Sequence, residues 1–137
     1  MKLLKSITVI LLGLAVCTTL AAQEKSAEQL KKEKEFYESI QKTVENYETL
    51  LELEAWQAFY VDSILTHDYT AMQEEVDQLV AKKVSNADLF YEVQDKWMEK
   101  MYVALNKVFD EDQWAKYLKS GAAREKKARD KRAAKKK

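Results

Sequence analysis

The chain has 137 residues, with 23 basic and 23 acidic side chains, two glycines and no proline. Once an N-terminal segment is set aside, this length suits a single domain with a modest hydrophobic core. Without proline and with so little glycine, the chain lacks the turn residues that repeated β-hairpins need, so an all-β fold is excluded.

The first 22 residues have the pattern of an export signal. Two lysines lie within residues 1–5, an apolar run covers residues 7–16, and small residues precede Gln23, which is the order found in secretory peptides. The run is shorter than the roughly 20 residues of a permanent transmembrane helix. We therefore expect cleavage after Ala21 or Ala22, and a protein that is exported, with the periplasm as its compartment.

A second processing route is open at Cys17. The segment Leu14-Ala15-Val16-Cys17 resembles a lipoprotein box, in which the cysteine would be acylated and kept as an anchor. Val16 stands where such a box has Gly, Ala or Ser, so we treat this route as the minor alternative. Because Cys17 is the only cysteine, loss of the signal leaves a chain without disulfides.

Charge is segregated along the rest of the chain. Residues 23–123 hold 12 basic and 21 acidic side chains, a net charge of −9, whereas residues 124–137 hold nine and two, a net charge of +7. The sequence therefore predicts three segments: the signal (1–22), an acidic helical domain (23–119) and a basic tail rich in alanine, lysine and arginine (120–137).

The first two helices are predicted from capping residues and apolar spacing. Ser26 and Gln29 have the spacing of a capping box, and apolar residues then recur every three, four or seven positions as far as Leu51. A second helical stretch covers about residues 54–83. Two places for a break stay open, one at residues 49–54 and one within residues 66–70.

The next two helices have clearer starting points. Ser85 as N-cap, with Asp88 three residues later, begins a helix that runs to about Lys107. Asp110 as N-cap and Gln113 begin a shorter one, with Phe109 packing on Trp114 as a hydrophobic staple. After Leu118 no large apolar residue follows. Alanine and lysine favour a helix in the tail, but without an apolar face it has nothing to bury, so we expect fraying or disorder at its end.

The third helix carries two apolar stripes. One of them, Tyr91, Met98, Tyr102 and Leu105, is either buried in the bundle or at a dimer seam, or is free to bind other proteins. Phe36 and Phe59 are added to it as further contacts. The candidate face for a client or a dimer partner is thus Tyr91, Met98, Tyr102, Leu105, Phe36 and Phe59.

One motif occurs twice, 56 residues apart. Leu53-Glu54-x-x-Gln57 and Phe109-Asp110-x-x-Gln113 each place an apolar residue, an oxygen acceptor and a glutamine at the same spacing. Both could be ordinary helix starts. They also make residues 50–119 resemble the Spy/CpxP family of periplasmic proteins, whose two Leu-Thr-x-x-Gln motifs begin helices; here Glu54 and Asp110 occupy the threonine positions.

The resemblance implies a small four-helix, cradle-shaped protomer. It implies ATP-independent chaperoning or, in some relatives, a role in envelope stress and metal sensing. The motif residues that correspond, Leu53, Glu54, Gln57, Phe109, Asp110 and Gln113, are structural in that family.

The sequence gives no support for an enzyme or for a metal site. His67 is the only histidine, and because Asp68 is its sequence neighbour we expect the two side chains to point to different faces, which defeats a triad with Ser63. One histidine and no retained cysteine provide no metal site, and no glycine-rich phosphate loop is present. We expect no cofactor.

The tail is a candidate for contact with anionic surfaces. Exported proteins meet few polynucleotides and no aromatic residue interleaves the basic ones, so we expect no nucleic-acid binding. One alternative is a solvated tail that only aids solubility. The others are contact with lipid headgroups or lipopolysaccharide phosphates and contact with the acidic part of another copy. The residues concerned are Arg124, Lys126, Lys127, Arg129, Lys131 and Arg132.

These observations predict an all-α fold: an elongated antiparallel hairpin or bundle, similar to a coiled coil, of three long helices and a shorter fourth with a basic C-terminal tail. We expect a homodimer that binds unfolded or assembling envelope proteins, as an ATP-independent chaperone or stress-related protein. The alternative is a self-associating structural protein whose tail contacts anionic polymers or lipids.

Overall fold

The computed structural model describes residues 25–135, so the predicted signal, its cleavage sites and Cys17 lie outside the described residues. By internal contacts the chain divides into Met1–Lys32 and Glu33–Lys137, and the packing described below is that of the second unit. Across the described residues the secondary structure is helical with no strand, which confirms an all-α fold.

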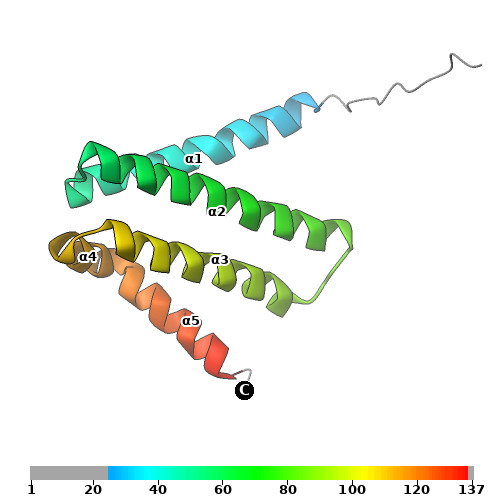
Figure 1. Ribbon diagram of the computed structural model, residues 1–137. Coiled ribbons are helices and arrows are strands. Elements are labelled where there is room, and N and C mark those ends of the chain that lie inside the picture. Colours follow the sequence, from blue (N-terminus) through cyan, green and yellow to red (C-terminus); the bar gives the residue numbers. More distant parts are fainter. Residues whose placement is uncertain (1–24, 136–137) are drawn as a thin grey trace, which may run out of the picture. The chain divides into compact units, whose positions relative to one another are not determined.

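Four α-helices are followed by a π-helical turn and a last helix (Figure 1). Their bounds are α1 Ala27–Leu51, α2 Ala55–Ala81, α3 Ala87–Val108, α4 Glu111–Tyr117, the π-helical turn Leu118–Ala122, and α5 Ala123–Lys135.

Helix α1 begins with the predicted capping box. The Gln29 N–H donates to Ser26 Oγ over 3.2 Å, and the Ser26 N–H donates to Gln29 Oε1 over 2.8 Å. The helix ends at Leu51, and Glu52 has a positive φ of 53°. The break between the first two helices therefore lies within residues 49–54, while α2 continues through residues 66–70.

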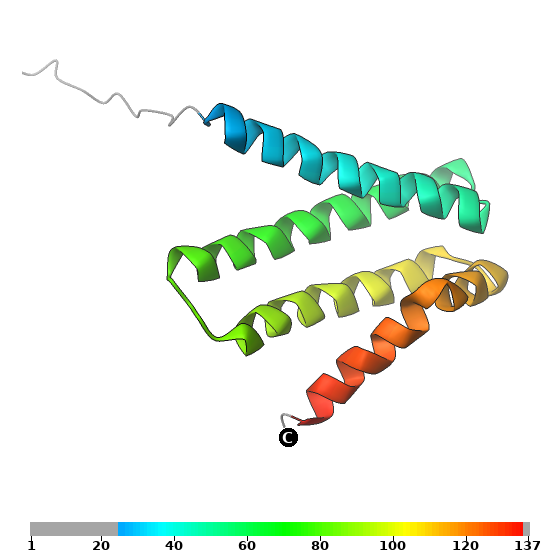
Figure 2. The same ribbon diagram turned by 180° about the vertical axis from the view of Figure 1, so that it is seen from behind.

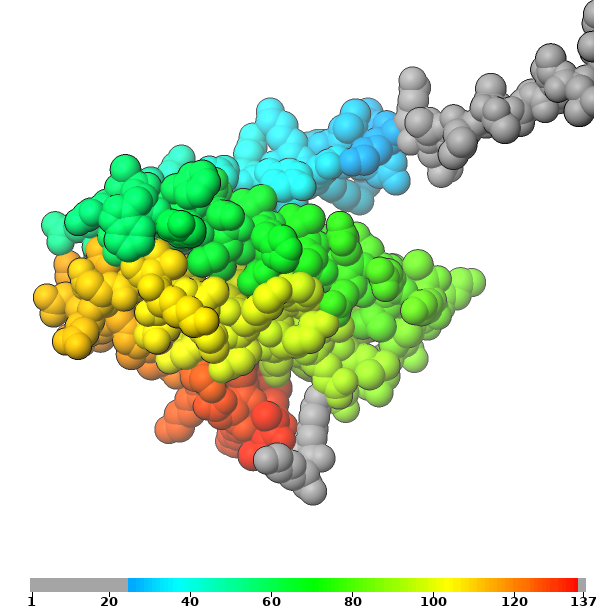
Figure 3. Space-filling view, in the orientation of Figure 1, coloured from blue at the N-terminus to red at the C-terminus, as the bar shows by residue number. Residues whose placement is uncertain are grey.

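Helices α2 and α3 lie side by side and run in opposite directions (Figure 2). Near the loop that joins them, Lys96 pairs with Glu75 at 2.6 Å; at the other end, Gln57 Nε2 donates to the Val108 carbonyl over 3.0 Å. The space-filling view shows the two helices in contact along their length (Figure 3).

The N-cap of α3 is Asn86, so the prediction of Ser85 is wrong by one residue. Asn86 Oδ1 accepts from the Asp88 N–H over 3.0 Å. The reason lies at the end of α2, where Lys83 has a φ of 54° and the Val84 N–H donates to the Leu79 carbonyl over 3.0 Å. This Schellman closure uses the chain as far as Val84, which delays the start of α3.

The hydrophobic core joins the second half of α1 to α2, α3 and the segment after α3. Apolar residues recur on one face of each helix, and packing these faces together buries their side chains away from water. The buried members are Ile40, Val44, Leu51, Val61, Leu65, Met101, Leu105, Phe109, Tyr117 and Ala122.

The basic tail is helical as far as Lys135, and its last two residues, at the end where fraying or disorder was expected, lie outside the described residues. Gly121, with a φ of 123°, turns the chain within the π-helical turn, just before α5, and side chains of α5 then reach α3. The sequence argument considered only apolar contacts and so did not predict that charged side chains hold α5.

Candidate functional site

The two glutamines of the repeated motif meet inside the protein. Gln57 Nε2 donates to Gln113 Oε1 over 2.6 Å, and Gln113 Nε2 donates to Gln57 Oε1 over 3.0 Å. The side chains are 4% and 8% exposed. We call this reciprocal pair the glutamine clasp. It joins the first turn of α2 to the first turn of α4.

Each glutamine is placed by the helix that it caps. Gln57 Oε1 also accepts from the Glu54 N–H, and Gln113 Oε1 from the Asp110 N–H, both over 3.0 Å. Asp110 Oδ1 in turn accepts from the Gln113 N–H over 2.8 Å, so Asp110 is the predicted N-cap. The clasp therefore provides hydrogen-bond partners both for the N-cap N–H groups of α2 and α4 and for the two buried side-chain amides. Buried polar groups require such partners.

Aromatic side chains pack beside the clasp. Phe109 lies 6.4 Å from Trp114 between ring centroids, and Tyr117 lies 5.6 Å from Tyr47. Burial raises the pKa of Tyr47 to about 12, with smaller contributions from Tyr69 and Glu125. Burial also raises the pKa of Tyr117 and Tyr69. These rings belong to the core, with Tyr117 buried and Tyr47 and Tyr69 packed against it.

A second aromatic group is exposed on α2. Trp56, Phe59 and Tyr60 are 52%, 69% and 52% exposed, and Tyr60 contacts both of the others at 6.2 and 5.8 Å between centroids. Trp56 Nε1 donates to the Glu54 carboxylate over 2.7 Å. We call these three residues the aromatic patch. Only Phe59 among them was predicted as a contact residue.

The structure disperses the rest of the predicted binding face. Leu105 is buried in the core, and Met98 and Tyr102 are half-buried against it. Phe36 is also half-buried, on α1. Tyr91 is exposed, with the Arg132 guanidinium 5.7 Å from its ring. The stripe of α3 is therefore divided between the core and the contact with α5.

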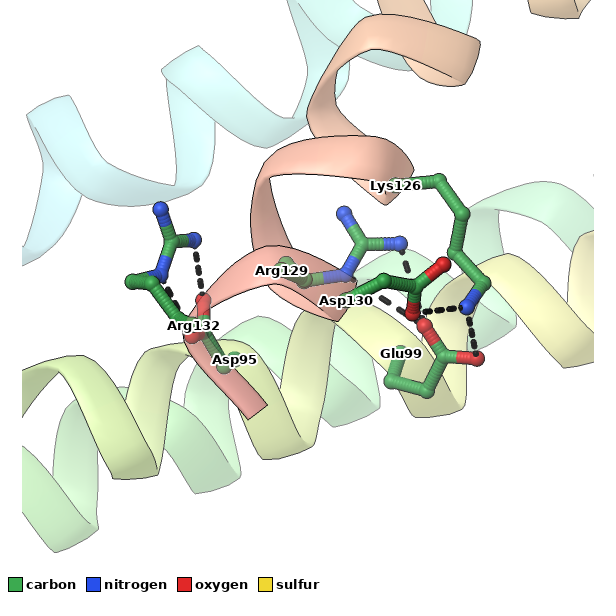
Figure 4. Close-up of polar contacts among 6 residues, drawn as sticks. All are labelled: Asp95, Glu99, Lys126, Arg129, Asp130 and Arg132. Atoms are coloured by element: carbon green, nitrogen blue, oxygen red, sulfur yellow. Dashed lines mark hydrogen bonds and ion pairs between the residues drawn. The ribbon is translucent and has the colours of Figure 1, made fainter. Parts of the chain in front are cut away.

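Helix α5 is tied to α3 by ion pairs (Figure 4). Arg132 donates to both carboxylate oxygens of Asp95 over 2.7 and 2.6 Å. Arg129, which is 7% exposed, lies 3.3 Å from Glu99, and Lys126 lies 3.3 Å from the same carboxylate. We call Lys126, Arg129 and Arg132 the inner set.

The other basic residues of α5 lie on the side of the helix away from the inner set. Arg124, Lys127, Lys131 and Lys135 are exposed and recur at intervals of three and four, the spacing of one helix face. Within residues 25–135 they make no ion pair. We call these four residues the outer row. The six predicted anion-contact residues thus divide equally between the two groups, and Lys135 is new.

Asp95 and Glu99 were missed by sequence reasoning. They lie four residues apart on α3, the spacing that matches cations at positions 129 and 132 on a facing helix. That match between an acidic pair and a basic segment was the available signal.

His67 and Asp68 form a contact that the sequence argument excluded. His67 Nδ1 lies 2.7 Å from Asp68 Oδ1, and Lys100 Nζ lies 3.5 Å from the same oxygen. The expectation that neighbouring side chains diverge was wrong, because the exposed imidazole turns back over the buried carboxylate. The site has no third catalytic member, since no contact joins Ser63 to His67 in the part of the chain that the structure describes.

No cluster of residues suited to hold a metal occurs among residues 25–135. In the same range, no helix has the length and apolar character needed to cross a bilayer.

Comparison with known proteins gives no assignment. No protein-family model matches the chain, and neither a curated protein nor a solved structure matches it.

Proposed function

We propose that the protein is an exported, non-enzymatic binding protein of the Spy/CpxP type, which holds unfolded or assembling envelope proteins without ATP. The observation that carries this proposal is the aromatic patch. Three large rings on consecutive turns of a helix, each at least half exposed, are a costly surface for a protein that has nothing to bind.

The patch is suited to varied apolar segments. Trp56 and Tyr60 combine an apolar ring with a polar group, so they can contact either apolar or polar parts of a chain. Glu52, Glu54 and Asp62 lie close by in the sequence, and their charges would keep a complex soluble. The glutamine clasp fixes the start of α2, so the patch rests on a rigid support.

We also propose that the protein is a homodimer in the form of an elongated antiparallel bundle. A second copy would cover some of the exposed apolar side chains outside the patch, among them Val80, Leu89 and Val103. Sedimentation of the purified protein at several concentrations tests this part of the proposal.

Suppression of aggregation tests the binding function. The purified protein should reduce light scattering by a chemically denatured client after dilution, in the absence of nucleotide. A variant with Trp56→Gln, Phe59→Ser and Tyr60→Ser should lose most of this effect, because it removes the apolar contact area.

The matched control is a variant with Leu30→Ser, Tyr37→Ser and Leu50→Ser, which removes exposed apolar side chains of α1 and should retain suppression. Equal activity of the two variants, or no suppression by the unaltered protein, would contradict the proposal.

The second candidate function is a self-associating structural protein whose α5 contacts anionic polymers or lipids. The outer row favours it. Salt-sensitive binding to anionic material, together with no effect on client aggregation, would support this candidate over the first.

A further inference from the structure

Helix α5 separates its charges by side. The inner set faces α3, and Asp130 pairs with Lys126 at 2.5 Å, while Glu125 lines the same small hollow as Tyr47 and Tyr69. At 100° per residue, the outer row centres on the side of the helix opposite the buried Arg129. Both acidic residues of α5 thus lie away from the outer row.

The four side chains of the outer row lie within about 80° of the circumference of α5, at 100° per residue. From Arg124 to Lys135 the row covers 12 residues, and the 11 steps between them extend about 16 Å along a helix. The other residues on that side are exposed alanines, at positions 123, 128 and 134, so no larger side chain projects between the cations. A plane can therefore touch all four cations at once.

We propose that the outer row binds the surface of an anionic lipid bilayer, with α5 lying flat on the headgroups. The helix is convex on this side, which fits a plane, whereas a linear polyanion would be better held by a groove. The ion pairs of the inner set keep the row turned outward. Because α5 has no large apolar residue to insert, attachment is electrostatic and reversible.

The expected strength follows from the number of cations. Each basic residue near an anionic surface contributes about a fivefold increase in partitioning, so four contribute roughly two to three orders of magnitude. Screening shortens the reach of these charges from about 10 Å at 0.1 M salt to about 3 Å at 1 M. Binding should therefore be lost at high salt.

Vesicle co-sedimentation tests the proposal on the protein as it is recovered after export. The vesicles contain phosphatidylcholine alone or phosphatidylcholine with an equal part of phosphatidylglycerol. The protein should sediment only with the anionic vesicles and at low salt. The variant Arg124→Gln, Lys127→Gln, Lys131→Gln and Lys135→Gln should lose this binding by roughly two to three orders of magnitude.

Two further variants isolate the row from net charge and from folding. Lys42→Gln, Lys82→Gln, Lys107→Gln and Lys119→Gln alters four exposed lysines elsewhere with the same change in net charge, and it should bind as the unaltered protein does. Replacing the three lysines of the row by arginine keeps the charges and should keep binding.

Other outcomes overturn the inference. Equal loss in the row variant and in the elsewhere variant would mean that only net charge matters. Binding to soluble polyphosphate but not to vesicles would identify a linear polyanion, and row-dependent dimerisation would identify a second copy of the chain. The aromatic-patch variant should still bind vesicles, so failure of this inference is separable from failure of the chaperone proposal.

Discussion

The glutamine clasp and the α5 contact attach helices to the same protein in different ways. The clasp buries two uncharged amides among aromatic rings and satisfies both helix starts. The α5 contact uses arginine and lysine side chains that reach across to Asp95 and Glu99. The first attachment depends on excluding water, whereas the second persists beside water.

This difference predicts two kinds of stability. A buried hydrogen-bonded network penalises any partial opening, because opening leaves polar groups unpaired. Ion pairs that keep one partner open to water, as Glu99 is beside the buried Arg129, weaken gradually with salt and contribute little to global stability. We expect the clasp to take part in cooperative unfolding, and α5 to detach first.

Removing one glutamine should have the largest effect. Gln113→Met removes both hydrogen bonds between the two amides and leaves the Asp110 N–H without its acceptor, while Gln57 keeps the Val108 carbonyl and the Glu54 N–H. We expect a loss of about 2–4 kcal/mol in the free energy of unfolding. Urea denaturation followed by circular dichroism measures it.

The double variant Gln57→Met, Gln113→Met should lose less free energy of unfolding than the sum of the two single losses. Either single variant already removes both hydrogen bonds between the two amides, so the double variant loses them only once. Gln29→Met is the matched control, because Gln29 has the same capping position but is exposed. Additive losses would show that the two amides do not depend on each other.

Alkaline pH should weaken the tyrosine packing beside the clasp. The pKa of Tyr47 is raised to about 12 from an ordinary value of 10.0, so between these values the unfolded chain has lost a proton that the folded protein retains. The contribution of Tyr47 to the free energy of unfolding is therefore complete below pH 10 and is lost as the pH rises to about 12. Two pKa units, at about 1.4 kcal/mol each, set its upper limit at about 3 kcal/mol.

Urea denaturation at a series of pH values measures this loss. In Tyr47→Phe the free energy of unfolding should decrease less steeply with pH. Ion pairs of lysine also weaken in this pH range, but they do so in both proteins. The same slope with tyrosine or phenylalanine at position 47 would refute the assignment.

Loss of Arg129 should have the smallest effect on global stability. Arg129→Gln removes the ion pair to Glu99 and the contact with the Tyr102 ring at 5.6 Å, so we expect a loss of about 1 kcal/mol. Hydrogen exchange should accelerate on α5 and remain unchanged at the start of α2. Added salt should reproduce this pattern in the unaltered protein, and uniform acceleration along the chain would contradict it.

The sequence predicted the elements whose signals are local. Ser26 with Gln29, and Asp110 with Gln113, mark helix starts because a capping box involves residues only three apart. The boundary at Ser85 was missed by one residue because it depends on how α2 ends. The pairing of Gln57 with Gln113 was visible only as a repeated spacing, since nothing local states that two caps meet.

The candidate site was predicted less completely than the fold. The α3 stripe read as one surface, but Leu105 faces the core and Tyr91 faces α5, a division that depends on where the neighbouring helices lie. The docking of α5 was missed because apolar residues were taken as the only means of packing. Charge complementarity between two segments some 30 residues apart needs both to be considered together.

The handedness of one carbon atom sets the direction of α5. A side chain at position 121 would meet no atom within 4 Å, so only the φ of 123° demands glycine there. The mirror image of this backbone conformation is open to ordinary residues, and D-alanine should therefore replace Gly121 with α5 still docked. L-alanine should turn α5 away from α3, and the outer row with it. Hydrogen exchange on the two semisynthetic proteins would distinguish them, and equal protection of α5 in both would show that the ion pairs alone decide its course.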